Sequence, residues 1–216
     1  MTSREAPGAD RWVPDRPTLR KLDSAVQDCR GCELYRDATQ AVMGRGDTGA
    51  GLMLLGEQPG DREDIEGEPF VGPAGGVLDK ALAEAGIAPD SVYTTNVVKH
   101  FRFRTVGKRR IHLSPTRGQV TACAPWLAAE LEVVRPAGVV LLGGTAGKAL
   151  YGSSFRVGKA RGKVVGWPED LPSTDPAPWV LATIHPSAVL RAEDDRQEAY
   201  DGLVADLRTA AAELKS

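Results

Sequence analysis

Short apolar runs alternate along this chain with longer stretches in which apolar residues recur every three or four positions. Four runs have the length of buried strands, and glycine or polar residues close them: Gly51–Gly56, Ser91–Val98, Gly138–Leu142 and Trp179–Ile184. Helical spacing predicts helices over Thr18 to about Asp28, Pro73–Ala85, Ser114 to about Val134, Thr145–Leu150 and Glu193–Leu214. Ser114 and Pro115 have the residue types of an N-cap and a first helical residue, and Gly86 that of a helix stop.

Strands that alternate with helices predict an α/β fold. Each strand–helix–strand unit crosses over in the right-handed sense, which makes the strands parallel and leaves helices on both faces of the sheet. We therefore expect a three-layer α/β/α sandwich around a four-stranded, mostly parallel central sheet. Ligands of such sheets bind beyond the carboxyl ends of the strands, so the residues after Leu55, Val98, Leu142 and Ile184 are the first candidates for function.

The length and composition fit one domain. The chain has 216 residues, of which 42% are hydrophobic and 26% charged, an ordinary globular composition. We expect a single domain over residues 18–216 and a disordered or loosely tethered leader over residues 1–17. The leader lacks an apolar segment, and no run of about 18 apolar residues exists, so neither a secretory signal nor a membrane span is predicted. We expect a cytoplasmic, monomeric protein with no membrane partner.

Glycine-rich turns follow the first predicted strand. Gly56–Asp61 comes directly after it, and a second turn, Gly72–Gly75, opens the next helix. Glycines let backbone N–H groups approach a ligand closely, and a helix N-terminus attracts phosphate, although such turns also occur without a ligand. Neither turn has the spacing of a dinucleotide-binding loop, and Gly143–Ala149 departs from that of a P-loop. The glycines by themselves leave the function open.

A basic segment follows the second strand, in a chain whose net charge is −2. Residues 99–117 contain seven Lys or Arg and no Asp or Glu, and aromatic side chains are interleaved with them. This composition is typical of segments that contact phosphates and stack on bases, so we expect nucleic-acid binding; the alternative is a solvated basic loop. The candidate DNA contacts are Lys99, Arg102, Arg104, Lys108, Arg109 and Arg110.

Three cysteines and one histidine form a candidate metal site. Cys29 and Cys32 are separated by two residues, and His100 and Cys123 follow at a distance along the chain. In a chain with an odd number of cysteines and no export signal, this spacing favours metal ligation over a disulfide framework. A Cys₃His set can hold a zinc ion or an iron–sulfur cluster, and the residues do not choose between them. The other interpretation is that each cysteine is a small buried hydrophobe.

The residues at the strand ends, taken in order, resemble the uracil-DNA glycosylase superfamily. The matching residues are Gly56–Gly60, Phe70, Asn96 and His185–Ser187, and the resemblance extends from about residue 29 to residue 207. It implies the α/β/α fold expected above. It also implies that the protein acts on uracil in DNA.

Two further features resemble particular branches of that superfamily. The cysteines resemble those of the iron–sulfur branch, family 4, except that His100 stands where that branch has a further cysteine. This implies a 4Fe–4S cluster on Cys29, Cys32, His100 and Cys123, with zinc as the alternative. The insertion Lys108–His112 resembles the variant called family X, in which a loop histidine attacks the deoxyribose.

The resemblance implies a uracil-binding pocket made by Gly56, Gln58, Phe70, Asn96, His185 and Ser187. Phe70 would stack on the base, Asn96 would bind its polar edge, and His185 would stabilise the departing uracil anion. The base has to be flipped out of a duplex or taken from a single strand, so the implied partner is uracil-containing DNA in one of these forms. Beyond the pocket, Val189 or Leu190 would wedge into the base stack, with Arg191 near a phosphate.

The resemblance to family X implies that His112 captures C1′ of the sugar, so that each enzyme molecule acts once. Gln58 stands where water-using relatives in family 1 have an aspartate, and an amide cannot act as a carboxylate base. Glu57 and Asp61 are the nearby carboxylates that would support the sugar cation or orient His112, and His185 completes the catalytic set. Without the resemblance, His112 would be interpreted as a phosphate or metal contact.

Three alternatives remain open on the sequence alone. The first is a family 4-like glycosylase that uses water and turns over repeatedly. The second is a metal-stapled module that binds uracil or abasic sites without cleavage. The third, an electron-transfer iron–sulfur protein, leaves Phe70, Asn96 and His185 without a role. Release of free uracil separates the enzymes from the binding module.

Overall fold

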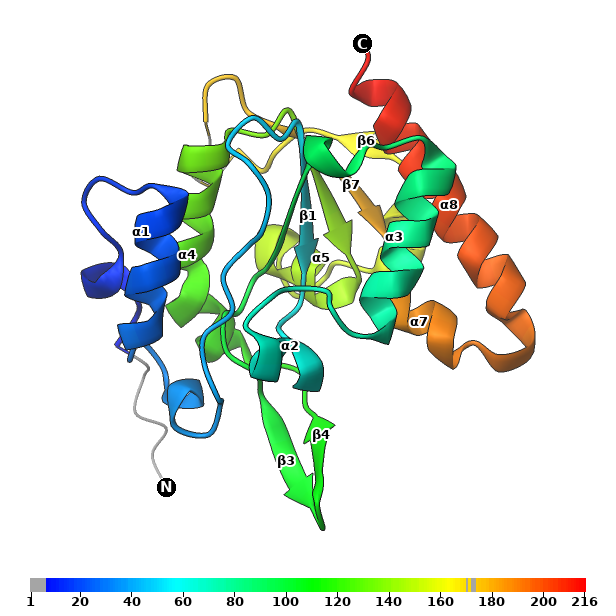
Figure 1. Cartoon of the computed structure of the whole chain (residues 1–216). Helices are drawn as coiled ribbons and strands as arrows, with labels where there is room; N and C mark the ends of the chain where they lie inside the picture. Colours follow the sequence, from blue (N-terminus) through cyan, green and yellow to red (C-terminus); the bar gives the residue numbers. More distant parts are fainter. Residues whose placement is uncertain (1–6, 170, 172–173) are drawn as a thin grey trace.

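The central sheet has five strands in the computed structural model, which describes residues 7–169, 171 and 174–216 (Figure 1). The strands lie in the order β2-β1-β5-β7-β6, with bounds Val92–Asn96, Leu52–Gly56, Gly138–Leu142, Trp179–Thr183 and Val164–Val165. The first four are parallel, which confirms the expected sheet. The predicted number of four strands is wrong, because β6 pairs antiparallel with β7 at the edge. A strand of two residues has no periodicity from which it could be predicted.

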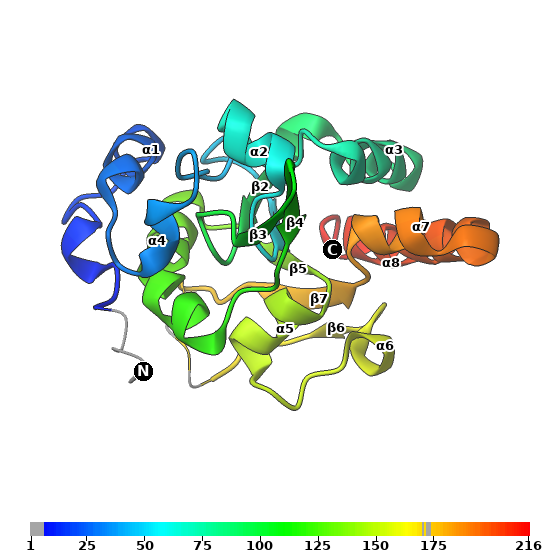
Figure 2. The ribbon, with the colours of Figure 1, turned by 90° about the horizontal axis from the view of Figure 1, so that it is seen from below.

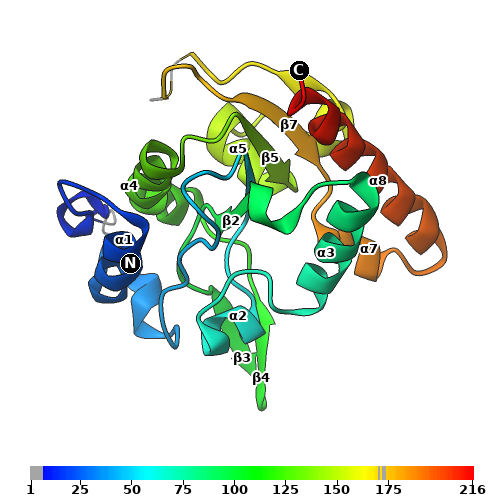
Figure 3. The same ribbon diagram turned by 45° about the horizontal axis from the view of Figure 1, so that its top comes forward.

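Two apolar cores cover the two faces of the sheet, as expected of a three-layer sandwich. Successive residues of β1 point to opposite faces, so Met53 and Leu55 join one core while Leu52 and Leu54 join the other. The first core includes residues of α1, α4 and α5 (Leu19–Ala25, Arg117–Val134 and Gly144–Tyr151). The second includes residues of α3 and α8 (Pro73–Ala85 and Arg196–Glu213), which lie on the other side of the sheet in Figure 3.

The predicted helices are present, with some differences at their ends. Helix α3 begins at Pro73 and ends at Gly86, whose φ of 74° is in the left-handed region that glycine tolerates. Helix α4 begins later than predicted, because Thr116 is its N-cap: the Thr116 hydroxyl accepts from the backbone N–H of Gln119, whose side chain accepts from the backbone N–H of Thr116. Ser114 and Pro115 therefore precede the helix.

Four short elements at the carboxyl ends of the strands were not predicted. They are α2 (Asp61–Glu66), the antiparallel hairpin of β3 and β4 (Phe103–Val106 and Arg109–His112), α6 (Val157–Ala160) and α7 (Pro186–Arg191). The basic segment expected as a loop is thus a hairpin, and it projects from the body of the molecule (Figure 1). The carboxyl edge of the sheet is therefore surrounded by short, separately placed elements.

The N-terminal segment differs from the loose leader that was expected. The backbone N–H of Gly8 donates to the carbonyl of Gly31 at 3.1 Å, and Ala9 is buried in the first core. The segment from residue 7 onward therefore packs against the turn that carries Cys29 and Cys32. Residues 1–6 of the predicted leader lie outside the described residues. Among the helices of the described chain, none is long and apolar enough to cross a bilayer.

Candidate active site

The carboxyl ends of the parallel strands align and open into a cavity of about 790 Å³. Gly56 pairs in register with Asn96, and Leu142 with Thr183, so the loops that follow these residues start at one level. Figure 2 views this end of the molecule, with the hairpin pointing toward the reader. The residues expected at the site that line the cavity are Glu57, Gln58, Asp61, Phe70, Asn96, His112, His185, Ser187, Leu190 and Arg191. Parallel register therefore brings together residues more than a hundred positions apart.

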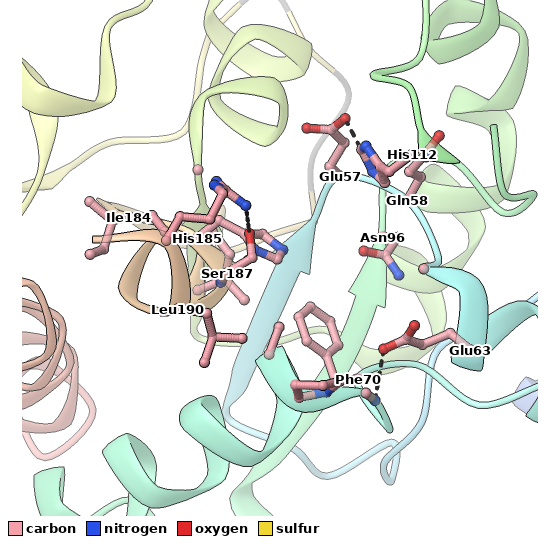
Figure 4. Close-up of a pocket in the computed structure, with 18 of the residues that line it drawn as sticks. Glu57, Gln58, Glu63, Phe70, Asn96, His112, Ile184, His185, Ser187 and Leu190 are labelled. Atoms are coloured by element: carbon pink, nitrogen blue, oxygen red, sulfur yellow. Dashed lines mark hydrogen bonds and ion pairs between the residues drawn. The ribbon is translucent and has the colours of Figure 1, made fainter. Parts of the chain in front are cut away.

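One wall of the cavity is formed by Phe70, Asn96 and His185 (Figure 4). The Phe70 and His185 rings lie 6.2 Å apart between centroids, at an interplanar angle of 25°. Asn96 is the last residue of β2 and is 4% exposed. A flat aromatic face, an amide and an imidazole thus border one space, and these groups can stack on a planar base and hydrogen-bond its edge.

Two glycines make the close packing of this wall possible. A Cβ atom on Gly56 would lie 2.3 Å from Oδ1 of Asn96 and 2.8 Å from the Phe70 ring. A Cβ atom on Gly75 would lie 1.5 Å from the backbone oxygen of Phe70. Phe70 itself has a φ of 59°, a strained value for an aromatic residue. In this conformation its backbone oxygen lies against Gly75. Glycine at position 56 therefore leaves the space that Asn96 and Phe70 occupy, and its predicted part in substrate binding stays a prediction.

His185 is a neutral hydrogen-bond donor at pH 7. Its Nδ1 accepts from the backbone N–H of Ser187 at 3.1 Å, and the Ser187 hydroxyl lies 2.8 Å from the same nitrogen. Arg191 donates to that hydroxyl at 2.9 Å. Burial lowers the pKa of His185 to about 4, against the opposing effect of Glu57. Because Nδ1 accepts, the ring proton is on Nε2, the nitrogen left for a ligand.

His112 and Glu57 face one another at the rim of the cavity. Nε2 of His112 lies 3.8 Å from Oε1 of Glu57, and the His112 side chain is 48% exposed. The Thr145 hydroxyl donates to Oε2 of Glu57 at 2.7 Å and so fixes the carboxylate. Oε1 is buried and has no hydrogen-bond partner among the described residues. One carboxylate oxygen is therefore oriented toward His112 and available to it or to a water molecule.

Gln58 holds the two ends of the hairpin together. Its Nε2 donates to the carbonyls of Arg102 and Leu113, at 3.1 and 3.2 Å, and its Oε1 accepts from the backbone N–H of Arg102 at 3.2 Å. These bonds use both amide groups of Gln58. Gln58 lines the cavity, but its side-chain amide binds the hairpin backbone, so the side chain positions the hairpin. A direct role of Gln58 in substrate binding and catalysis stays a prediction.

Arg110 ties the hairpin to α2. Its guanidinium is paired with both Asp61 and Asp64 and lies over the Phe103 ring, 5.1 Å from the centroid. The predicted role of Arg110 as a phosphate contact is corrected, because these two carboxylates already neutralise its charge. Asp61, predicted to assist His112, is instead a partner of Arg110. The pair fixes the strand on which His112 lies.

A family model described as the uracil DNA glycosylase superfamily matches residues 43–208. The chain belongs to the uracil-DNA glycosylase superfamily. Curated relatives named type-4 uracil-DNA glycosylase resemble it over most of its length. Those from Pyrobaculum aerophilum and Thermotoga maritima are each 35% identical, over 173 and 171 residues, covering 80% and 79% of this chain and 85% and 82% of the relatives. The relative from Archaeoglobus fulgidus is 34% identical over 190 residues, covering 83% of this chain and 88% of its own.

Two predicted DNA contacts of this superfamily member are corrected by burial. Lys99 is fully buried and pairs with Glu130 at 2.6 Å, so its ammonium cannot reach a phosphate. Val189 is 2% exposed and packs in the second core, whereas its neighbour Leu190 lines the cavity, so Leu190 is the one of the two that remains a candidate wedge. Both errors have one cause, because a short pattern does not tell which of two neighbouring residues faces the core.

The remaining predicted DNA contacts lie on or near the surface. Arg104, Lys108 and Arg109 are exposed on the hairpin. Arg102 donates to the carbonyl of Ser114 at the base of the hairpin, and Arg191 lies at the rim of the cavity. The hairpin therefore presents three basic side chains beside the candidate active site, and their contact with DNA stays a prediction.

The three cysteines expected to bind a metal are buried in the first core. The Trp126 indole N–H donates to Cys29 Sγ, and the Lys99 backbone N–H to Cys123 Sγ, both at 3.3 Å. Burial raises the pKa of Cys123 to about 12, and nearby Lys99 opposes this effect. His100 is buried near Arg30, which lies between Cys29 and Cys32, and burial lowers the pKa of His100 to about 4. Within residues 7–169, 171 and 174–216, no group of three such side chains is arranged to hold a metal ion.

Several residues of the site were missed from the sequence. Thr145 orients Glu57, and Glu63 lines the cavity and accepts from the backbone N–H of Gly72 at 2.9 Å. Thr145 could have been found, because it follows the third strand end within three residues. Glu63 could not, because α2 was not predicted and nothing local distinguishes it from the other acidic residues of that helix.

Proposed function

We propose that this protein is a uracil-DNA glycosylase that releases uracil from DNA and then captures the abasic sugar through His112. Base release rests on one observation above all, the neutral His185 with its Nε2–H left for a ligand beside Phe70 and Asn96. Capture rests on the position of His112 beside Glu57 at the mouth of the same cavity. DNA is the substrate that the superfamily implies.

The cavity wall supports recognition of an extruded uracil. Phe70 offers a ring face for stacking, and the Asn96 amide offers both a donor and an acceptor to the base edge. When the N-glycosidic bond breaks, its electron pair leaves with the base as a uracil anion. The Nε2–H of His185 stabilises the charge on the uracil oxygen without a change in its own protonation, because its pKa is far below 7.

The sugar cation that remains is captured by His112. A lone pair on a ring nitrogen of His112 forms a bond to C1′, which leaves the imidazole positively charged. Glu57, 3.8 Å away, stabilises that charge and accepts the proton from the other nitrogen or passes it to water. The uracil anion takes a proton from solvent. With no group to break the C–N bond, each enzyme molecule acts once.

A second candidate is water attack with repeated turnover. It is favoured by the buried Oε1 of Glu57, which lacks a partner among the described residues and could accept the proton of a water molecule. It is also favoured by the relatives' name, type-4 uracil-DNA glycosylase. Gln58 does not provide the base for this reaction, since its amide binds the hairpin.

Cys29, Cys32, His100 and Cys123 are proposed to hold a 4Fe–4S cluster. The buried thiols and their N–H···S hydrogen bonds suit a thiolate-bound cluster, which accepts such bonds. When bound, the cluster would join the Cys29–Cys32 turn, the segment after β2 and α4 through metal–ligand bonds. Iron and sulfide analysis of anaerobically purified protein, with Cys32→Ser for comparison, tests this assignment. Stoichiometric iron is expected in the parent and little in the variant.

The decisive experiment for His112 mixes the protein with uracil-containing single-stranded DNA and separates the products on a denaturing gel, while free uracil is measured in parallel. We expect one uracil released per protein and a protein–DNA band that survives denaturation. His112→Ser should abolish that band and allow some turnover, because the smaller side chain admits water. Free-running DNA with excess uracil released would establish water attack instead, and no uracil release at all would establish a binding module.

A further inference from the structure

A second segment without acidic residues borders the cavity. Residues 99–117 hold seven, and residues 133–168 hold six, of the chain's 27 Lys and Arg, whereas neither segment holds any of its 29 Asp and Glu. The first segment includes the hairpin. The basic residues of the second segment have no role in the site described so far. In a protein whose net charge is −2, two such segments concentrate positive potential at particular places.

The middle of the second segment lies at the rim of the cavity. Gly143 and Gly144, where α5 begins, and Val157, where α6 begins, all line the cavity. Phe155 packs against Gly147 of α5, where a Cβ atom would lie 2.0 Å from the Phe155 ring. This contact places α6 beside α5. In Figure 2, both helices lie on the side of the rim away from α2 and α3.

On α5, on α6 and between them, three basic side chains are exposed and have no ion-pair partner in the part of the chain that the structure describes: Lys148, Arg156 and Lys159. Arg156 uses one nitrogen to bind the carbonyls of Ser153 and Phe155, which holds its guanidinium at the surface. Arg161 differs, because it pairs with Asp206 at 2.8 Å. The three side chains therefore keep their full charge near the cavity.

We propose that Lys148, Arg156 and Lys159 bind backbone phosphates of the DNA strand next to the target nucleotide. The proposal rests on the glycosylase function, and it adds a contact surface on α5 and α6 that is separate from the hairpin. Phosphate is the ligand because the side chains are basic, no acidic residue lies in the segment, and the segment borders the cavity that receives the nucleotide. DNA is thereby held on two sides of the opening.

The test compares Arg156→Ala/Lys159→Ala with Arg20→Ala/Lys215→Ala, a control that removes two exposed charges elsewhere. Binding of the full-length variants to a uracil-free single-stranded oligonucleotide is measured over a range of salt concentrations, so the result does not depend on catalysis. Each lost phosphate contact should lower the slope of log K against log salt by about 0.7, and affinity should fall on the order of tenfold at about 0.1 M salt. The control should leave the slope unchanged.

Shortened oligonucleotides locate the contact. The parent and the variant should differ in affinity for DNA with both flanks and for DNA that keeps only the flank that these side chains bind. They should bind equally well to DNA that lacks that flank. On uracil-containing DNA, in single-turnover measurements, the variant should need a higher concentration for the half-maximal rate of uracil release, while the maximal rate should be unchanged. An unchanged salt slope, or an equal effect in the Arg20/Lys215 control, would overturn the proposal even if uracil release is observed.

Discussion

The three histidines of this chain have the same side chain but three different environments. His100 is buried beside the cysteine-bearing turn, His112 is about half exposed on the hairpin, and His185 is partly buried at the cavity wall. The tautomer of His185 is set by the backbone N–H of Ser187, and the other two histidines have no such bond within the described residues. What a histidine can do therefore depends on the atoms around it, and burial makes His185 a neutral donor over a wide pH range.

This burial should also make the stability of the protein depend on pH. The pKa of His185 is lowered from 6.5 to about 4 in the folded state, so between these values the unfolded chain takes up a proton that the folded protein does not. The free energy of unfolding should therefore fall as pH is lowered through this range, by up to about 1.4 kcal/mol per unit. His185→Asn should remove this part of the dependence. Urea denaturation of both proteins at pH 7 and pH 5 measures this dependence. An equal change in the free energy of unfolding between the two pH values in both proteins would contradict the prediction.

The hairpin shows how one element separates two functions by strand alternation. On one face, Arg110 and His112 point toward the body, where they meet Asp64 and Glu57. On the other face of the same strand, Arg109 and Ile111 are exposed. Arg110 and Gln58 hold the hairpin at two places, so His112 is presented on a fixed strand. We expect this preorganisation to determine how fast His112 reacts.

Arg110→Met should loosen the hairpin, and Arg109→Met is the matched control on the same strand. Asp64 is fully buried, so loss of Arg110 leaves its charge with the Thr39 backbone N–H as its remaining partner. The expected cost is roughly 2 kcal/mol in the free energy of unfolding, together with slower adduct formation. Arg109→Met should change stability by less than about 0.5 kcal/mol. Urea denaturation and adduct time courses test both, and equal behaviour of the two variants would show that the clamp has no effect.

At the scale of the whole molecule, a buried ion pair joins the sheet to the layer that carries the cysteines. Lys99 Nζ contacts Glu130 of α4, the Thr95 hydroxyl and the Asn96 carbonyl, at 2.6 to 2.7 Å. Glu130 also accepts from the Tyr93 hydroxyl at 2.9 Å. Every charge in this group has hydrogen-bond partners, which is the condition under which a buried pair is tolerated. The network therefore fixes the end of β2, from which Asn96 enters the cavity.

Breaking this pair on one side should cost more than removing it entirely. Lys99→Met leaves the Glu130 carboxylate buried without its counter-charge, and we expect a loss of roughly 3 to 5 kcal/mol in the free energy of unfolding. The double variant Lys99→Met/Glu130→Gln should lose less than the sum of the two single variants, because no charge remains buried. Denaturant unfolding of all four proteins provides the cycle. Additive losses would show that the two residues act independently.

Much of the fold and of the site could be predicted from the sequence. The four parallel strands and the main helices follow from periodicity, because the spacing of apolar residues indicates which face of an element is buried. Since parallel strands end at one edge, the sequence places Asn96 and His185 together, whereas Phe70 and His112 are placed beside them by the resemblance to the superfamily. Residue 123 was placed correctly on a helix by the same spacing.

The tertiary structure alone decided which partner each side chain has. Lys99 and Arg110 belong to the same basic segment, yet one is buried against Glu130 and the other is paired with Asp61 and Asp64. The Gln58 amide binds the hairpin backbone. These outcomes depend on residues about thirty to fifty positions away, whose distance is set by the packing of whole elements. Local patterns report the preference of a residue for the interior or the surface, whereas its partner and its pKa depend on the assembled molecule.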